Sequence, residues 1–515
     1  MKPIKKIVVV GGGTAGWLTA CIIAARHKGR EASGFSVTLI ESANTPTIGV
    51  GEGTWPTMRS TLSRIGVSET EFFRQCDAAF KQGALFSRWT TGQASDAYFH
   101  PLMLPQGFSH TNLVPHWLQQ NLHKSSEQNF CDAVCPQGVI CQKGLAPKTI
   151  SHAEFEAVAN YAYHLDAGKF AVFLQQHACK QLNVQHRIAD VTQVKLTDSG
   201  DIDRLVLNGD QEIAGDLFID CTGFRALLIG DAMQVPFKDC KDILFCDTAL
   251  AVQVPYENEF SPIATHTIST AQSAGWIWDI GLPTRRGVGH VYSSQHISDE
   301  QAERELAAYI GKDSVSARKI KIRAGHRETF WKNNCVAVGL SAGFMEPLEA
   351  SAIVMIELSA KLIAEQLPVC REVMDIVAKR FNATTLYRWG RIIDFLKLHY
   401  VLTQRRDSDF WRDNLDPSSI PDRLKELLLL WSYQSPWFHD EFNQVEEIFP
   451  AASYQYVLYG MKFKTQVEAD TLQNTAKYAE RLLRENRNLT EKLGLSLPYH
   501  RDLIMKIHER GLQTV

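Results

Sequence analysis

Long apolar runs are missing from this chain. No stretch approaches 18 uncharged apolar residues, so no transmembrane helix is expected. An excess of one charge sign is missing too, because 54 Lys and Arg residues face 57 Asp and Glu residues and leave a formal net charge of −3. This balance argues against a nucleic-acid partner or an acidic membrane surface. Met1–Lys6 leads into a glycine turn, without the cleavage site of a signal peptide, so a cytoplasmic location is expected.

A disulfide framework and internal repeats are also missing. The 11 cysteines are odd in number and irregular in spacing, and several lie in apolar segments, which is typical of reduced core thiols. Cys131, Cys135 and Cys141 lie close together in sequence, but their spacing matches neither a CxxC pair nor a zinc finger. No metal site is therefore predicted.

What is present indicates two parts. At 515 residues the chain exceeds the usual size of one hydrophobic core. A mixed α/β part with an interleaved sheet and loops is predicted for 1–370, and a mainly helical part that covers the substrate site for 371–515. Residues 85–150 lack periodicity and are predicted as loops and short strands. Strands are predicted at 6–10, 36–40, 189–207 (alternating), 217–219, 248–254 and 288–293, and helices at 17–26, 152–176, 350–366, 373–399, 421–432 and 469–493.

A GxGxxG sequence, Gly11 to Gly16, separates the first strand from the first helix. Gly11 permits a tight turn, Gly13 lets the backbone approach a pyrophosphate, and Gly16 lets the helix pack closely on the strand. The helix start at Thr14 and Ala15 offers N–H groups and partial positive charge to phosphates. A Rossmann-type dinucleotide site is therefore predicted.

The dinucleotide is predicted to be FAD. Glu41 ends the second strand, where an acid can bind both ribose hydroxyls. A nicotinamide dehydrogenase would continue with further βαβ units, whereas this chain continues with IGVGEG, in which Gly49 and Gly51 permit close approach of a flat ring.

Two later segments support FAD. Residues 216–223 and 335–343 resemble the second nucleotide-contact strand and the strand under the ribityl chain of FAD monooxygenases, and the latter contains Gly339 and Leu340. No second GxGxxG follows, so a built-in NAD(P)H site is not expected.

Five short motifs, in the same order, resemble the flavin-dependent tryptophan halogenases over most of residues 1–400. They are GGGTAGW at 11–17, IGVGEG at 48–53 (family IGVGEA), FKQGALFSRW at 80–89 (FKxAxKFxNW), GWIWDI at 275–280 (WxWxIP) and MEPLEASAI at 345–353 (LEPLESTGI). The resemblance implies a mixed α/β fold with a Rossmann-type FAD-binding domain of the flavin monooxygenase class.

The resemblance also implies a reaction. FADH2 from a separate flavin reductase, with O2 and chloride or bromide, would halogenate an indole or another electron-rich aromatic by way of a flavin hydroperoxide and hypohalous acid. Lys81 and Glu349 fall on the catalytic lysine and glutamate. The Lys81 ammonium could donate a hydrogen bond to hypohalous acid, or its free amine could form a haloamine; both remain open. Glu349 would stabilise the cationic ring intermediate and take its proton.

Further positions follow from the same resemblance. The backbone N–H groups of Ser351 and Ala352 would bind the halide. Trp276 and Trp278 would form a wall between flavin and substrate. The predicted partners are a small or peptide aromatic substrate and the reductase, and a homodimer is compatible with the resemblance.

Departures from the family pattern keep a second hypothesis open. Gly281 replaces the proline of WxWxIP, Leu85 replaces a second lysine, and Ala352 replaces a glycine that would tolerate positive φ. A flavin monooxygenase or dehydrogenase on the same scaffold, without halide chemistry, is therefore the alternative. A flavin-binding protein without turnover ranks last, because it gives no reason to keep four residues together: Lys81, Glu349, Trp276 and Trp278.

The substrate is not expected to be free tryptophan. Members specific for tryptophan carry a YYxxxxYE module, and residues 443–459 read NQVEEIFPAASYQYVLY instead. An indole, another electron-rich arene or a larger tryptophan-containing molecule is the expected substrate.

Overall fold

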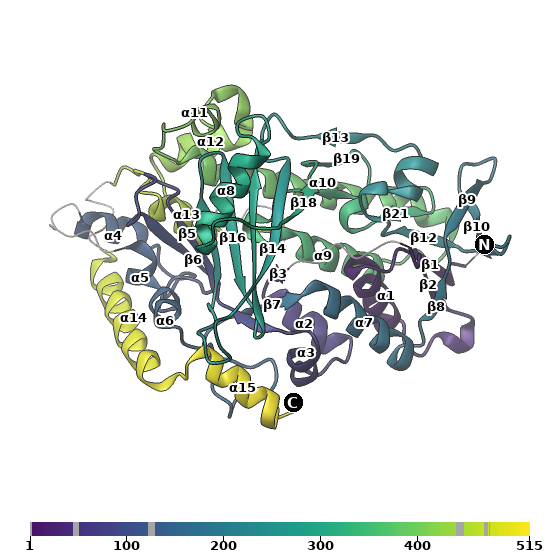
Figure 1. Ribbon diagram of the computed structural model, residues 1–515, viewed down its shortest axis with the longest axis horizontal. Coiled ribbons are helices and arrows are strands. Elements are labelled where there is room, and N and C mark those ends of the chain that lie inside the picture. The colour runs from purple at the N-terminus through teal and green to yellow at the C-terminus, as the bar shows by residue number, and fades with distance from the viewer. Residues whose placement is uncertain are drawn as a thin grey trace. The chain divides into compact units, whose positions relative to one another are not determined.

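The computed structural model describes residues 3–44, 51–121, 129–438, 447–467, 472 and 474–514 (Figure 1). Its contacts divide the chain into two compact units, each assembled from three segments. The first unit comprises Met1–Ala78, Leu165–Cys240 and Arg323–Trp389, and the second comprises Ala79–His164, Lys241–Ile322 and Gly390–Val515. The division predicted near residue 370 stays a prediction. Within these described ranges, no helix is long and apolar enough to cross a membrane.

The first unit is organised around a six-stranded sheet of order β20-β21-β12-β1-β2-β8. Neighbours from β21 to β8 run parallel, and β20 pairs antiparallel at one edge. The last four residues of β1 are apolar and only 0 to 4% exposed, as expected for a parallel strand covered on both faces. The strands are β1 (Lys6–Val10), β2 (Ser36–Glu41), β8 (Gln185–Ile188), β12 (Leu217–Asp220), β20 (Trp331–Lys332) and β21 (Cys335–Ala337).

Helix α1 (Thr14–Arg26) packs against β2 and against the helices α7 (Ala167–Gln181) and α9 (Ser351–Glu365). Figure 1 shows α1, in purple, beside β1 and β2. The strands predicted at 6–10, 36–40 and 217–219 are confirmed, and the helix predicted from residue 17 begins at Thr14. The unit also contains β3 (Gly51–Gly53), α2 (Thr57–Arg64), α3 (Glu69–Gln75), β9 (Val191–Leu196), β10 (Ile202–Leu207), β11 (Glu212–Ala214), β13 (Phe237–Asp239), β19 (Gly325–Arg327) and β22 (Gly343–Phe344).

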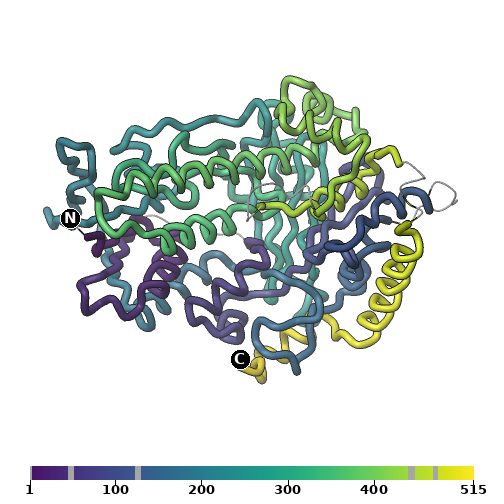
Figure 2. Tube along the Cα trace, turned by 180° about the vertical axis from the view of Figure 1, so that it is seen from behind, coloured from purple at the N-terminus to yellow at the C-terminus, as the bar shows by residue number. Residues whose placement is uncertain are grey.

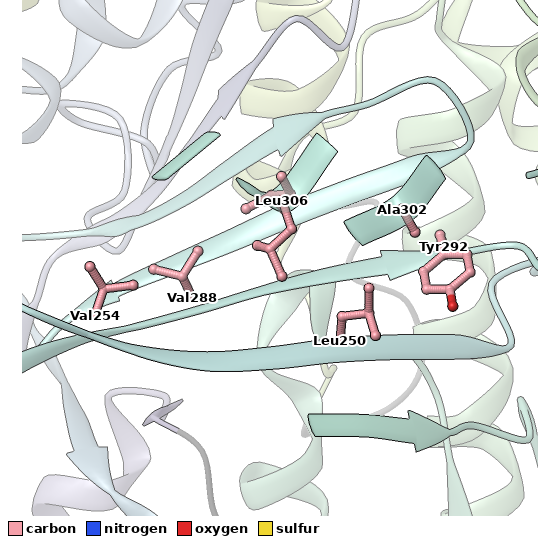
Figure 3. Packing of buried hydrophobic residues seen from close by; sticks show 7 residues of the cluster. Leu250, Val254, Val288, Tyr292, Ala302 and Leu306 are labelled. Carbon is pink, nitrogen blue, oxygen red and sulfur yellow. The ribbon is translucent and has the colours of Figure 1, made fainter. Parts of the chain in front are cut away.

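The second unit contains a seven-stranded sheet of order β18-β14-β17-β16-β15-β5-β6. Its neighbours pair antiparallel, except that β5 and β15 run parallel. Figure 3 shows a cluster of buried side chains from β14, β17 and α8 (Asp299–Ile310), among them Leu250, Val288 and Leu306. The strands are β5 (Gly83–Ser87), β6 (Ala97–Pro101), β14 (Thr248–Pro255), β15 (Thr267–Ala271), β16 (Gly275–Gly281), β17 (Arg285–Tyr292) and β18 (Arg318–Lys321).

Helices follow in the C-terminal part. The long α10 (Arg371–Val401) begins in the first unit and ends in the second. Helix α14 contacts α5 and α6, and Figure 2 shows the yellow α14 beside these blue segments. The helices of the second unit are α4 (Val114–Asn121), α5 (Phe130–Val134), α6 (Gln137–Gln142), α11 (Asp409–Asp413), α12 (Asp422–Trp431), α13 (Ala451–Gly460), α14 (Ala476–Ser496) and α15 (His500–Arg510).

Most of the predicted elements are confirmed. Helices predicted at 350–366, 373–399 and 421–432 correspond to α9, α10 and α12, and strands predicted at 248–254 and 288–293 to β14 and β17. The alternating segment 189–207 contains β9 and β10. The helix predicted at 469–493 begins at Ala476 as α14, and some residues before it lie outside the described part.

The single helix predicted at 152–176 is wrong. Its middle forms β7 (Ala162–Asp166), which pairs antiparallel with β4 (Ala79–Lys81), and α7 begins only at Ala167. The Asp166 side chain caps α7 by accepting a hydrogen bond from the Lys169 N–H at 3.0 Å. Small and apolar residues fit a buried strand as well as a helix, and the strand partner that decides between them is distant in sequence.

The prediction of loops and short strands for 85–150 was only partly right. Strands β5 and β6 are there, but so are the helices α4, α5 and α6. Each has at most 8 residues, which is too short for a helical repeat of apolar residues to stand out.

A buried carboxylate, Asp220, ties the end of β12 to the segment that follows it. Its Oδ1 accepts hydrogen bonds from the Thr222 N–H at 2.9 Å and the Thr222 hydroxyl at 2.6 Å. Its Oδ2 accepts from the N–H groups of Leu228 and Ile229, both at 2.8 Å. Burial raises the pKa of Asp220, and these four donors oppose that shift.

The substitution Asp220→Ala should destabilise the first unit, because it leaves these buried donors without their acceptor. The expected loss is about 3 kcal/mol in the free energy of unfolding. Urea unfolding followed by circular dichroism measures it, and Asp198→Ala at an exposed position is the control. Equal unfolding midpoints for Asp220→Ala and the wild type would contradict this account of β12.

Candidate functional site

The glycine turn after β1 is built for close approach of backbone. A Cβ on Gly16 would lie 1.8 Å from the carbonyl oxygen of Gly11, so α1 can sit this close to the turn only with glycine there. A Cβ on Gly13 would meet no atom within 4 Å, so the space beside this residue is open.

Helix α1 starts at that open space. Its N-cap is Gly13, and no side chain accepts a hydrogen bond from the first N–H groups, which begin at Thr14 and Ala15. A helix start without a side-chain cap keeps its N–H donors and its partial positive charge for another acceptor. This arrangement fits the diphosphate of a dinucleotide.

Glu41 lies beside the same turn. A Cβ on Gly12 would lie 2.1 Å from the Glu41 Cδ, so this carboxyl group covers the Gly12 backbone. The His186 Nε2 is 3.0 Å from the Glu41 Oε2 and holds the side chain, which stays 31% exposed. The partly exposed carboxylate next to the turn fits the ribose hydroxyls predicted for it.

Gly339 and Leu340 begin a short 3-10 helix, η4 (Gly339–Ser341), in the same unit. A Cβ on Gly339 would lie 2.7 Å from the Cβ of Ala15, so η4 contacts the first turn of α1. The structure thus brings together the glycine turn, Glu41 and Gly339. Gly51 is buried in β3, and Gly49 lies outside the described residues.

Glu349 lies at the start of α9. It ends a 3-10 turn, η5 (Pro347–Glu349), and its residue is 7% exposed. Its carbonyl oxygen accepts a hydrogen bond from the Trp55 Nε1 at 2.8 Å, which ties it to the segment after β3. Ser351 and Ala352 form the first turn of α9, whose N-cap, Ala350, makes no side-chain hydrogen bond.

The concern about Ala352 is resolved by the backbone. Ala352 has an ordinary helical conformation in α9, and the residue with positive φ is Ala350, at 54°. The N–H of Ala352 is therefore directed like any other in the first turn of a helix, and its alanine side chain does not disturb it.

Lys81 belongs to the second unit. It ends β4, where it lies opposite Ala162 of β7, and it is only 5% exposed. The next residue, Gln82, donates its backbone N–H to the Thr265 carbonyl at 2.7 Å. A lysine so buried is unusual unless its amine interacts with something specific.

Three buried histidines interact electrostatically with one another, and one of them, His164, also with Lys81. The pKa of His164 is lowered by burial and then by Lys81, His500 and His266. Burial also lowers the pKa of His266 to about 4 and that of His500 to about 4. All three imidazoles are therefore neutral at neutral pH.

Trp276 and Trp278 lie two residues apart in β16, so their side chains point to the same face. They are 0% and 6% exposed, and their ring centroids are 6.4 Å apart. A Cβ on Gly289 of the neighbouring strand would lie 2.1 Å from the Trp278 Cη2, so this indole lies over the glycine. The two indole rings meet edge to face, with an interplanar angle of 63°.

Comparison with known proteins decides the family. The tryptophan halogenase family model matches residues 6–477. The chain belongs to the tryptophan halogenase family. It is an enzyme of the flavin-dependent halogenase class.

Individual relatives agree with this halogenase assignment. A tryptophan 6-halogenase from Streptomyces toxytricini is 34% identical over 478 residues, which cover 88% of this chain and 89% of the relative. The crystal structure of a tryptophan halogenase from Shewanella frigidimarina NCIMB 400 has a TM-score of 0.96 at 47% identity, covering 100% of this chain and 99% of that one. A flavin-dependent halogenase from Brevundimonas sp. BAL3 has a TM-score of 0.87 at 32% identity, covering 98% and 99%. The predicted mixed α/β fold is confirmed.

The alternative hypothesis, a monooxygenase without halide chemistry, loses its support. These relatives are halogenases, and the positive φ that Ala352 was expected to resist lies at Ala350. Gly281 pairs with Arg286 at the end of the β16–β17 ladder. At this position glycine keeps the backbone N–H that a proline would lack. The halogenase tolerates both departures without a break in its local structure.

Sequence analysis missed two acids of the halogenase, Glu357, which is buried, and Glu52, which is partly buried. Burial raises the pKa of Glu357, in α9, to about 8, although the hydroxyls of Thr61 and Thr57 donate to it at 2.6 and 3.3 Å. Burial, and then Asp166, raise the pKa of Glu52 to about 7. An acid inside the apolar stretch Val354–Glu357 is the signal that could have revealed the first.

The buried histidines predict an acid-sensitive fold. The unfolded chain takes up protons on His266 and His500 near pH 6.5, whereas the folded chain does so only near pH 4. The stability they contribute is complete above about pH 6.5 and falls as the pH decreases toward 4, by about 1.4 kcal/mol per pH unit for each histidine. Glu357 acts in the opposite sense, because its folded pKa is raised.

The comparison of two proteins isolates the histidine effect. Urea unfolding gives the free energy of unfolding of the wild type and of His266→Gln at pH 7.5 and pH 5.0. Its decrease from pH 7.5 to pH 5.0 should be smaller in the variant. An identical decrease in the free energy of unfolding in both proteins would contradict the neutral state assigned to His266.

Proposed function

We propose that this halogenase uses FADH2 from a separate reductase, O2, and chloride or bromide to halogenate an indole or another electron-rich aromatic. The observation that carries the proposal is the burial of Lys81, a residue 5% exposed whose charge adds to the burial that lowers the pKa of His164. Such a site keeps water away from a reactive amine.

The first unit would hold the FAD. The N–H groups at Thr14 and Ala15 would bind the diphosphate, and Glu41 would accept hydrogen bonds from the ribose hydroxyls. The rest of the FAD site would be lined by Gly49, Gly51, Gly339 and Leu340. Bound reduced FAD supplies the two electrons that let O2 oxidise the halide to hypohalous acid. The chain has no second GxGxxG, so the reduced cofactor would come from a separate flavin reductase.

Lys81 would hold the oxidant. As an ammonium it would donate a hydrogen bond to hypohalous acid, and as a free amine it would form a haloamine; both routes stay open. The wall of Trp276 and Trp278 would keep the substrate from the flavin. Their burial and shared face support that role.

Glu349 would act on the aromatic ring. Its carboxylate would stabilise the cationic ring intermediate and take up the proton that the ring loses. The N–H groups of Ser351 and Ala352 would bind the halide, since α9 has no side-chain cap at its start.

The substrate proposed is an indole or a larger tryptophan-containing molecule. Relatives are named for tryptophan, but the aromatic and acidic module expected for the free amino acid is absent from residues 443–459. In the described part of that segment, Tyr454, Tyr456 and Tyr459 are 6%, 2% and 3% exposed. These tyrosines belong to the core of the second unit, which supports a substrate other than free tryptophan.

Glu41→Ala should weaken FAD binding about 10- to 100-fold, because each lost hydrogen bond to a charged group is worth about 1.5–3 kcal/mol. Quenching of flavin fluorescence on titration measures the Kd. Glu31→Ala, an exposed acid in the same unit, should leave it unchanged. A Glu41→Ala Kd equal to that of the wild type would remove Glu41 from the cofactor site.

Lys81→Ala should lower halogenated product at least about a hundredfold, as expected for a positioned catalytic group. The assay supplies FAD, a flavin reductase, NADH, O2 and bromide or chloride to a panel of indoles, with products identified by mass spectrometry. FAD binding should stay within twofold, and Lys425→Ala is the control at an exposed lysine. Hydroxylated product alone from the wild type, or full activity of Lys81→Ala, would contradict the proposal.

A further inference from the structure

The C-terminal helix α15 places a histidine against the strand of Lys81. His500 is the first residue of α15, and it is 1% exposed. It lies beyond residue 477, where the match to the family model ends. Its role therefore has to come from its own contacts.

Both ring nitrogens of His500 are used. The backbone N–H of Phe80 donates to the His500 Nε2 at 3.0 Å, and the His500 Nδ1 lies 3.1 Å from the Ile263 carbonyl oxygen. A backbone N–H can only donate, so Nε2 accepts and the ring proton sits on Nδ1, which donates to Ile263. The ring is thus a neutral bridge between two backbones, and burial, which lowers its pKa to about 4, keeps it so.

The bridge matters because of where Phe80 lies. Phe80 immediately precedes Lys81 in β4, a strand of three residues at the edge of its sheet. The Phe80 N–H donates to the imidazole instead of to another strand, so His500 takes the place of a strand neighbour along this edge. The rings of Phe80 and His500 also lie 5.9 Å apart, centroid to centroid.

The start of α15 is itself firmly held. The His500 N–H donates to the Gly144 carbonyl, and the Ala146 N–H donates to the Pro498 carbonyl, both at 2.9 Å. The next residue, Arg501, donates from Nη1 to the Pro283 carbonyl at 3.1 Å, and its guanidinium lies 4.9 Å from the Tyr256 ring centroid. These contacts hold the start of α15 in place, and the His500 imidazole therefore offers the Phe80 N–H an acceptor at a fixed position.

We propose that His500 is a positioning residue for Lys81: it clamps the backbone of β4 so that the lysine amine is held in one place. The inference rests on the proposed role of Lys81. A short edge strand without this clamp would let the amine shift, and a misplacement of about 1 Å can slow catalysis on the order of a hundredfold. Hypohalous acid would then escape before it reaches the substrate.

Two variants separate the clamp from simple loss of packing. His500→Met keeps a side chain of similar size but has only a weak acceptor, whereas His500→Gln keeps an amide oxygen that can accept the Phe80 N–H. His508→Met, at an exposed position of the same helix, is the matched control. For each protein, kcat, KM, FAD affinity, melting temperature, hypohalous acid captured by a soluble scavenger, and deuterium exchange at the Phe80 amide are measured.

In His500→Met, kcat should fall roughly ten- to a hundredfold, with KM and FAD affinity within twofold. Exchange at Phe80 should be faster and scavenged hypohalous acid should rise, and His500→Gln should restore all three. A folded His500→Met with wild-type kcat would overturn the proposal. If that variant does not fold, His500→Gln decides: restored protection at Phe80 with unrestored kcat would overturn it.

The result also separates this inference from the function on which it rests. Full activity of Lys81→Ala would remove the role of Lys81 and the clamp with it. Loss of activity in Lys81→Ala together with normal catalysis in His500→Met would overturn the clamp alone. If both proposed roles hold, the double variant Lys81→Ala, His500→Met should be no slower than Lys81→Ala alone.

Discussion

The first unit depends on the contact between Gly16 and the carbonyl of Gly11, where helix and turn approach as closely as two backbones can. This contact fixes α1 against β2 and leaves the start of the helix at the end of the parallel strands. Glu41, at the end of β2, then lies over Gly12, and η4 reaches Ala15. Backbone packing therefore brings together the groups that are suited to bind a dinucleotide.

Sequence analysis was most successful where structure is local. The strand at 6–10, the glycine turn and the following helix are specified within about 20 residues, and the strand at 36–40 depends on the same apolar pattern. It failed at 152–176, because β7 forms by pairing with β4, a segment far away in the chain. It also could not find His500: a single histidine at a helix start carries no local signal, and its importance comes from Phe80, some 420 positions earlier.

The residues proposed for the site divide in the same way. Lys81, Glu349, Trp276 and Trp278 come from short motifs shared with a family, which a single chain can display. Their supports come from elsewhere: Trp55 holds the carbonyl of Glu349, Gly289 lies under Trp278, and the buried His164 lies within electrostatic reach of Lys81. Motifs identify the chemical groups, whereas the folded chain determines what surrounds them. This is why the concern about Ala352 could be settled only by the backbone, which places the left-handed residue at Ala350.

Two acids of the first unit, Glu52 and Glu357, change the electrostatic balance of the protein. A formal net charge of −3 treats Glu52 and Glu357 as anions. Burial, however, raises their pKa values to about 7 and about 8, so both carboxyl groups carry less negative charge at neutral pH than ordinary glutamates. Both belong to the unit that we propose to receive a diphosphate and a halide. If the proposal holds, that unit would admit the two anions with less repulsion than its composition suggests, because protons on carboxyl groups lower its negative charge.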